Sequence, residues 1–221
     1  MLTSAAIITM LYNNASQFNL YFSARAARAN IVNEINIEKI SDITEMALDK
    51  KFMGWVSGGQ ISAGISPWSQ NKNIRHEVSY YITDKKSNSV NLDISEPTLH
   101  ALGIKTHSLM FNTFYDFKNN GRITPYVGAG IGMGFLDWDI MDVSLLNSLF
   151  SYFSSESAFT FSYALIAGAE YKLNKRFSLD LIARYFDLGK IHTTNRLVSG
   201  DVPSNTSVHG MEFAFGIRYT F

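Results

Sequence analysis

The stretch ITPYVGAGIGMGF, residues 123–135, decides the fold of this chain. From Ile123 to Phe135 every odd position is apolar, whereas the even positions hold Thr124, Tyr126 and then four glycines. Successive side chains of a β-strand point to opposite faces. Alternation with period two therefore predicts a strand with one apolar face and one small or polar face.

The same alternation recurs along the chain. It is clear in residues 159–172, 177–185 and 211–221, and the charged residues of these segments always fall between the apolar positions. Weaker forms occur in residues 18–25, 55–65, 74–83 and 109–117. Together they predict eight strands, near 18–27, 54–66, 73–83, 104–118, 122–136, 158–173, 176–187 and 208–221.

The connections between these strands alternate between short and long. Three are short, at 67–72, 119–121 and 174–175, and the long ones lie at about 28–53, 84–103, 137–157 and 188–207. Outer-membrane barrels divide periplasmic turns from surface loops in this way. The sequence therefore predicts an all-β protein, an eight-stranded antiparallel up-and-down transmembrane β-barrel formed by residues 16–221, with the four long loops at the cell surface.

Turn parity predicts the register across two of the short connections, because residues on one face must lie opposite each other. Phe117 is expected to pair with Ile123 around a three-residue turn that ends in Gly121, a position where such turns favour a positive φ. Glu170 is expected to pair with Asp180 across the next turn.

Composition excludes several classes of function. Charged residues make up 17% of the chain, below the roughly 25% of an average soluble protein. Lys plus Arg and Asp plus Glu both number 19, so no overall positive field attracts nucleic acid, and we expect no nucleic-acid partner. The absence of Cys excludes disulfides, thiolate metal sites and thiol nucleophiles.

The N-terminal residues 1–15 suggest a targeting segment. The apolar run at residues 5–11 has the length of a signal-peptide core, and Ala15 is a small residue suited to a cleavage point, although the usual basic segment does not precede it. We interpret residues 1–15 as the remnant of a signal peptide. The alternative is an ordinary apolar N-terminus.

Charges and glycines on the non-apolar face indicate which face points inward. The interior of an eight-stranded barrel is just wide enough for side chains, which favours small residues there. A charge on the lipid face would cost about 2–4 kcal/mol at the membrane midplane. We therefore predict an interior ion-pair network that plugs the lumen, formed by Arg75, Glu77, Asp116, Glu170, Lys172, Asp180, Arg184, Glu212 and Arg218.

Four segments carry a family resemblance: LMFNTFYDF (109–117), TPYVGAGIG (124–132), SLDLIARYFDLG (178–189) and FGIRYTF (215–221). They resemble the opacity-protein-like outer-membrane barrels, a family that includes surface antigens of obligate intracellular α-proteobacteria. The resemblance covers residues 54–221 and implies the outer membrane of a Gram-negative bacterium. The chain end, with Phe221, Tyr219, Ile217 and Phe215, is similar to the signal that the outer-membrane assembly machinery reads.

Motifs that could carry chemistry have a simpler explanation. The glycines of 127–134 recur every second residue, whereas a dinucleotide-binding loop needs a turn and a helix after the strand. His76, His107 and His209 are expected on the lipid face, and no two histidines have the spacing of metal ligands. His107 and Ser108 are neighbours in a strand, so they point to opposite faces and cannot form a nucleophile–base pair. We expect no catalysis, metal or cofactor.

Three functions remain in order of preference. The first is a surface protein that acts through its extracellular loops in adhesion, antigenic display or envelope integrity, with outer-membrane lipid, the assembly machinery and host surface molecules as partners. The second is a porin for small solutes, and the third a barrel-embedded enzyme that modifies lipids. The loop segments 38–51, a candidate helix, and 145–153 are apolar enough either to contact a partner or to pack on themselves.

Overall fold

The fold was obtained as a computed structural model, which describes residues 18–37, 48–67, 73–84, 86–91, 98–144, 151–197 and 200–221. Side chains are described within residues 19–34, 53–66, 73–84, 105–137, 158–190 and 207–221. Across these ranges, no helix is long and apolar enough to cross a membrane. The expected signal-peptide remnant, residues 1–15, lies outside the described part of the chain.

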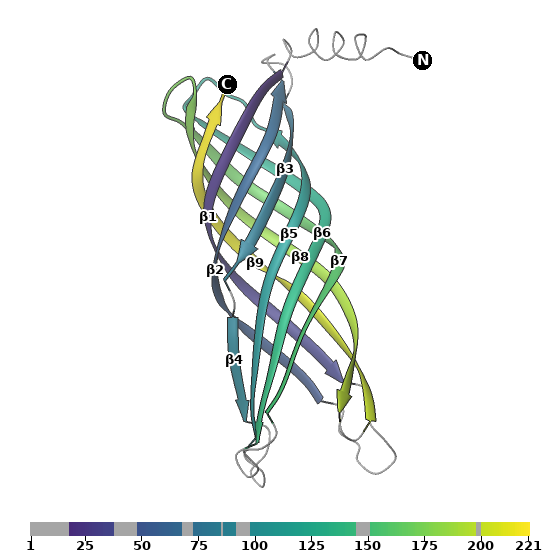
Figure 1. The fold of residues 1–221 in the computed structure, drawn as a ribbon. Helices are drawn as coiled ribbons and strands as arrows, with labels where there is room; N and C mark the ends of the chain where they lie inside the picture. The colour runs from purple at the N-terminus through teal and green to yellow at the C-terminus, as the bar shows by residue number, and fades with distance from the viewer. Residues whose placement is uncertain are drawn as a thin grey trace, which may run out of the picture.

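The described elements are antiparallel strands that close into a barrel (Figure 1). Their order is β3-β2-β1-β9-β8-β7-β6-β5-β4, and the pairing of β3 with β5 closes the ring. β3 and β4 follow each other along the same side of β5 and both pair with it, so together they count as one strand of the barrel. The barrel therefore has eight strands, as predicted. The bounds are β1 Phe18–Ile37, β2 Leu48–Pro67, β3 Ile74–Thr83, β4 Lys86–Asn91, β5 Thr98–Asp116, β6 Ile123–Ser144, β7 Ser151–Lys172, β8 Phe177–Leu197 and β9 Gly200–Thr220.

The apolar face of the strands points outward. Phe159 is 71% exposed and Phe161 66% exposed, although both belong to a regular strand. Charged side chains such as Asp180 and Glu212 lie on the opposite face and are fully buried. This distribution is the inverse of a water-soluble barrel, and it confirms the predicted assignment of the two faces.

The turns between β5 and β6 and between β7 and β8 lie at one end of the barrel, together with the start of β1 and the end of β9 (Figure 1). Glu170 pairs with Asp180, as predicted. The predicted pairing of Phe117 with Ile123 is wrong by two residues, because the Phe117 amide donates to the carbonyl of Pro125. The side chain of Asn119 widens this turn: it accepts from the Gly121 amide and donates to the Ile123 carbonyl. The described glycine with a positive φ is Gly189, not Gly121.

The strands extend far beyond their predicted ends on the opposite side. β6 and β7 each have 22 residues, whereas a strand needs only about 9–11 residues to cross a bilayer. Most of the segments predicted as loops, 28–53, 84–103, 137–157 and 188–207, are therefore strand. Residues 48–51 lie in β2 rather than in a helix, and residues 151–153 lie in β7; residues 38–47 and 145–150 are outside the described part.

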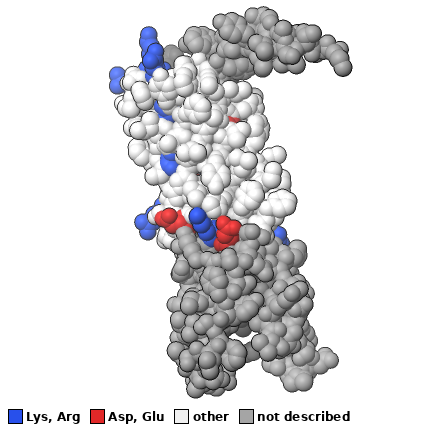
Figure 2. All heavy atoms as spheres, viewed as in Figure 1, with Lys and Arg blue, Asp and Glu red and all other residues white. Residues whose placement is uncertain are grey.

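The outer surface marks where the membrane ends. The outward residues of β6 are apolar from Ile123 to Phe135, and the next outward residue is Asp137. Figure 2 shows the result as a largely uncharged belt between a basic rim and a band of mixed charge. The strands continue past that band, so the barrel projects beyond the membrane on the side opposite the short turns (Figure 1).

Candidate functional site: the barrel interior

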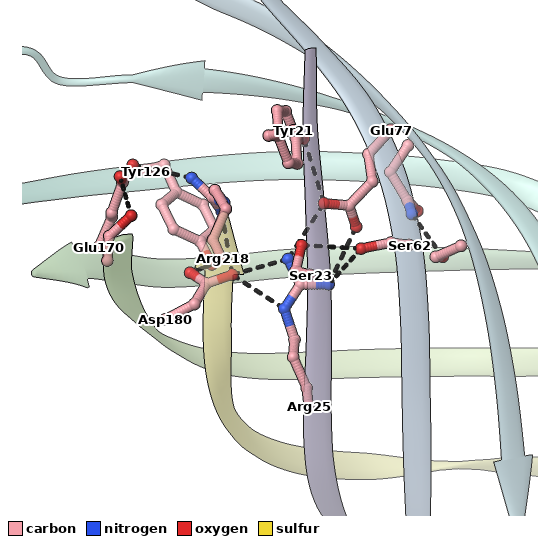
Figure 3. Close-up of polar contacts among 12 residues, drawn as sticks. Tyr21, Ser23, Arg25, Ser62, Glu77, Tyr126, Glu170, Asp180 and Arg218 are labelled. Carbon is pink, nitrogen blue, oxygen red and sulfur yellow. Dashed lines mark hydrogen bonds and ion pairs between the residues drawn. The ribbon is translucent and has the colours of Figure 1, made fainter. Parts of the chain in front are cut away.

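Arg25 of β1 lies at the centre of a buried ionic network (Figure 3). Its Nη2 lies 3.0 Å from Oε2 of Glu77, and its Nε donates to Oδ2 of Asp180 at 2.8 Å. Nη1 donates to the Ser62 hydroxyl, which is also 2.9 Å from the hydroxyl of Ser23. The Arg25 guanidinium therefore joins β3 and β8, each of which lies beyond a strand adjacent to β1.

Arg75 occupies a neighbouring position between two aromatic rings. Its guanidinium carbon is 4.0 Å from the ring centroid of Phe114 and 4.4 Å from that of Tyr126. Nε donates to Asp116 at 2.8 Å, and Nη1 donates to the hydroxyl of Tyr21 at 3.0 Å. A planar guanidinium suits this arrangement, because it can stack on rings while it donates at its edge.

Arg218 connects two carboxylates that would otherwise repel each other. Glu170 and Asp180 are opposite each other on β7 and β8, as the turn parity predicted. Arg218 Nη1 lies 2.7 Å from Glu170, and Nη2 lies 2.9 Å from Asp180. Tyr126 donates a further hydrogen bond to Asp180 at 2.6 Å. The network thus includes residues from all eight strand positions of the barrel.

Glycines provide the space for the two tyrosines of the network. A Cβ atom at Gly64 would meet the ring of Tyr21, and one at Gly168 would meet the ring of Tyr126. In the glycine stripe of β6, Gly128 serves packing in the same way, because a Cβ atom there would meet the ring of Phe114 from the adjacent strand β5.

A second layer lies further along the interior. Arg184 donates to Glu212 at 2.8 Å, and its guanidinium lies 4.5 Å from the ring centroid of Tyr81. Apolar side chains from several strands fill more of the interior, including Ile31, Val56, Leu136, Leu188 and Val208.

The predicted network residues divide into three groups. Glu170 and Arg218, with Arg75, Glu77, Asp116 and Asp180, belong to the main network; Arg184 and Glu212 form the separate second layer. Lys172 is exposed and has no ion pair with another described residue. Sequence reasoning omitted Arg25 from the network, although the residue fell on the polar face of the predicted first strand. Phe215, Ile217 and Phe221 are exposed on the outer face, and their role as an assembly signal stays a prediction.

The described residues contain no group of three or more His, Asp or Glu arranged to hold a metal ion. His107 and Ser108 lie on opposite faces. His107 Nδ1 is 2.8 Å from the Tyr80 hydroxyl on the outside, whereas Ser108 is buried inside. The two residues therefore do not form a nucleophile–base pair.

The family model for the outer membrane protein beta-barrel domain matches residues 2–221. The chain belongs to this family. Its place is therefore the bacterial outer membrane. In such barrels the short turns face the periplasm and the opposite end projects from the cell.

Several relatives of this outer-membrane barrel place it with the opacity-like proteins. The outer membrane protein PagN of Salmonella typhimurium is 25% identical over 53% of this chain and 51% of its own length. The protein opa of Haemophilus influenzae is 29% identical over 42% of this chain and 70% of its own length. A candidate adhesin of Rickettsia conorii is 22% identical over 51% of this chain and 47% of its own length. The chain thus spans about half the length of PagN and of the rickettsial protein.

The solved structure of OprG, an outer membrane protein from Pseudomonas aeruginosa, has the same fold. It superposes with a TM-score of 0.60 at 13% identity and covers 93% of this chain and 96% of OprG. At that identity the likeness concerns the fold alone.

Proposed function

We propose that this barrel is a non-catalytic surface protein that binds host surface molecules through the part that projects from the outer membrane. The observation that carries this proposal is the length of the strands. β6 continues for residues 138–144 beyond the charged band, and β7 approaches that band through residues 151–157. A barrel that served only to fill the membrane would not need these extensions.

The extensions favour a surface that is rigid enough for recognition. Backbone pairing continues to Ile37 and Leu48 between β1 and β2, and to Leu197 and Gly200 between β8 and β9. Ordered strands lose less conformational entropy on binding than long loops do. The name of the rickettsial relative, a candidate adhesin, supports the same proposal.

The interior network argues against a porin. Arg25, Glu77, Asp180 and Arg218 are all buried and paired with one another in the lumen. A hydrated ion would have to break these pairs to pass. We therefore expect purified protein in a planar bilayer to give no steady conductance, and a steady ohmic current would favour the porin instead.

Trimming the extensions tests the adhesive function. Residues 35–50, 87–103, 138–156 and 191–206 would each be replaced by Asn-Gly, a two-residue turn that suits a hairpin. The flanking pairs Glu34–Lys51, Lys86–Ile104, Asp137–Ser157 and Lys190–Ser207 are already opposite each other, so the register is kept.

Adherence to cultured host cells is then compared among bacteria that display the full chain, the trimmed barrel or neither. The full chain is expected to raise adherence, and the trimmed barrel to match the empty control while still showing heat-modifiable gel migration. Equal adherence of the trimmed and full barrels would contradict the proposal. Adherence of the full chain no higher than that of the empty control would contradict it as well.

A further inference from the structure

The periplasmic mouth of the barrel contains a cavity of about 360 Å³, a volume within the range of small-ligand pockets. It lies between the main ionic network and the end of the barrel that has the short turns. Six cationic side chains line it: Arg75, Lys118, Lys172, Lys175, Arg176 and Arg218. Only two acidic side chains line it, Asp116 and Glu170. We call this cavity the mouth site.

Both acids of the mouth site accept hydrogen bonds from arginines of the main network. Asp116 accepts from Arg75 Nε at 2.8 Å. Glu170 accepts from Arg218 at 2.7 Å and from the Ser178 hydroxyl at 2.6 Å. Among the described residues, Lys172 has no anionic partner. The cavity therefore has an excess of positive charge.

Two residues that line the mouth site each have a buried polar atom without a partner among the described residues. Arg75 is 1% exposed, and its Nη2 has no hydrogen-bond partner among the described residues. Thr124 is 3% exposed, and its Oγ1 also lacks a partner there. Buried polar groups are normally hydrogen-bonded. A guanidinium N–H and a hydroxyl are both donors that an oxyanion could satisfy.

Two lysines, Lys118 in the turn after β5 and Lys172 at the end of β7, line the mouth site near its opening. Burial lowers the pKa of Lys118, and the charge of Lys172 lowers it further, whereas the carboxylates of Asp116 and Glu170 raise it. Two ammonium groups that repel each other at the entrance of a cavity are stabilised by an anion between them.

We propose that the mouth site binds a phosphate-bearing ligand from the periplasm. A phosphate group offers several acceptor oxygens and up to two charges, which suits a buried Arg, a hydroxyl and flanking lysines. The cavity lies inside the ring of strands rather than on the lipid face, which favours a soluble phosphate compound over a phospholipid headgroup. This site is at the opposite end from the proposed adhesive surface, so either proposal can fail without the other.

Thermal unfolding of the full chain, refolded in a non-ionic detergent, tests the mouth site. Inorganic phosphate and glycerol phosphate are titrated against sodium chloride at equal ionic strength and pH. A ligand that binds only the folded state raises the unfolding temperature. We expect a saturable rise with phosphate, with a Kd of about 1 mM or tighter, and none with chloride. Dihexanoyl phosphatidylglycerol forms a separate arm; a rise with this lipid alone would make a lipid headgroup the source.

Three variants separate binding from folding. The double variant K118Q/K172Q should weaken phosphate binding about tenfold, the loss expected for two charge-assisted contacts. Thr124→Val should also weaken it, yet leave the unfolding temperature without phosphate unchanged or higher, because it removes a buried hydroxyl that has no partner. Lys190→Gln, at the other end of the belt, should bind phosphate as the parent chain does.

Two results would overturn the mouth site. One is a rise with chloride equal to that with phosphate, which would leave only a general salt effect. The other is a phosphate effect that persists in both K118Q/K172Q and Thr124→Val, which would place the anion elsewhere.

Discussion

The guanidinium of Arg25 binds the carboxylate of Asp180 over the intervening strand β9, with Nε 2.8 Å from Oδ2. The same guanidinium reaches over β2 to Glu77 at 3.0 Å. All three side chains are buried, so each charge depends on the others for compensation. This dependence makes the centre of the barrel sensitive to single substitutions in a way that the lipid face is not.

Arg25→Met should destabilise the barrel most. Removal of one partner from a buried ion pair typically costs about 3–5 kcal/mol, because the other charge remains buried. Urea unfolding in detergent would measure the loss. The double variant R25M/D180N should recover part of the lost free energy of unfolding, because one of the two carboxylates left without Arg25 is then replaced by a neutral amide. If the double variant loses the full sum of the two single losses, the pair is not coupled.

Arg218→Met should lower the unfolding temperature because Glu170 and Asp180, opposite each other, lose the cation that separates them. The matched control is Arg28→Met, which makes the same chemical change on the outer face of β1, where Arg28 is exposed. We expect this control to change the free energy of unfolding by less than about 0.5 kcal/mol. Equal effects of the two substitutions would show that interior position is irrelevant.

Gly168→Val should displace the Tyr126 ring and weaken its hydrogen bond to Asp180. Overpacking of this kind costs about 1–3 kcal/mol. The control Ala167→Val makes a similar enlargement at the preceding residue, whose side chain is exposed on the outer face, and it should be tolerated. Loss of stability in Ala167→Val alone would reverse the assignment of the two faces.

A charge on the lipid face should be costly in proportion to its depth. Leu165→Arg, near the middle of the apolar part of β7, is expected to lower the free energy of unfolding in lipid vesicles by about 2–4 kcal/mol. Phe159→Arg lies close to the charged band and should cost about 0–1 kcal/mol. A larger loss at Phe159 would move the membrane boundary outward along the strands.

Alternation predicted the fold wherever the two faces of a strand meet different surroundings. β6 from Ile123 to Phe135 has lipid on one side and a crowded interior on the other, and its sequence alternates accordingly. Asp137 interrupts the run of apolar outward residues, and the clear period-two pattern of the sequence ends there. The strand continues without such a pattern, and for that reason the sequence predicts a loop at residues 137–157 where the structure has strand on both sides.

The predicted network was incomplete for a different reason. Parity shows which residues point inward, but the stagger between strands decides at which height they meet. Arg25 is opposite Gln60 in the register, yet it binds Glu77 and Asp180, each two strands away. Its role depends on the shear of the closed barrel, which no local pattern reports. The register across Asn119 was missed because a side chain, rather than the number of residues, sets the width of that turn.

The position of Arg25 also constrains how the protein enters its membrane. One of its partners, Glu77, lies on the β1 side of the pairing between β1 and β9, and the other, Asp180, lies on the β9 side. Arg25 can therefore form both ion pairs only after the first and last strands have paired. An open sheet in the membrane would expose unpaired charged side chains and unpaired backbone groups of its edge strands to hydrocarbon. We therefore expect closure of the barrel between β1 and β9 to be coupled to its insertion into the membrane.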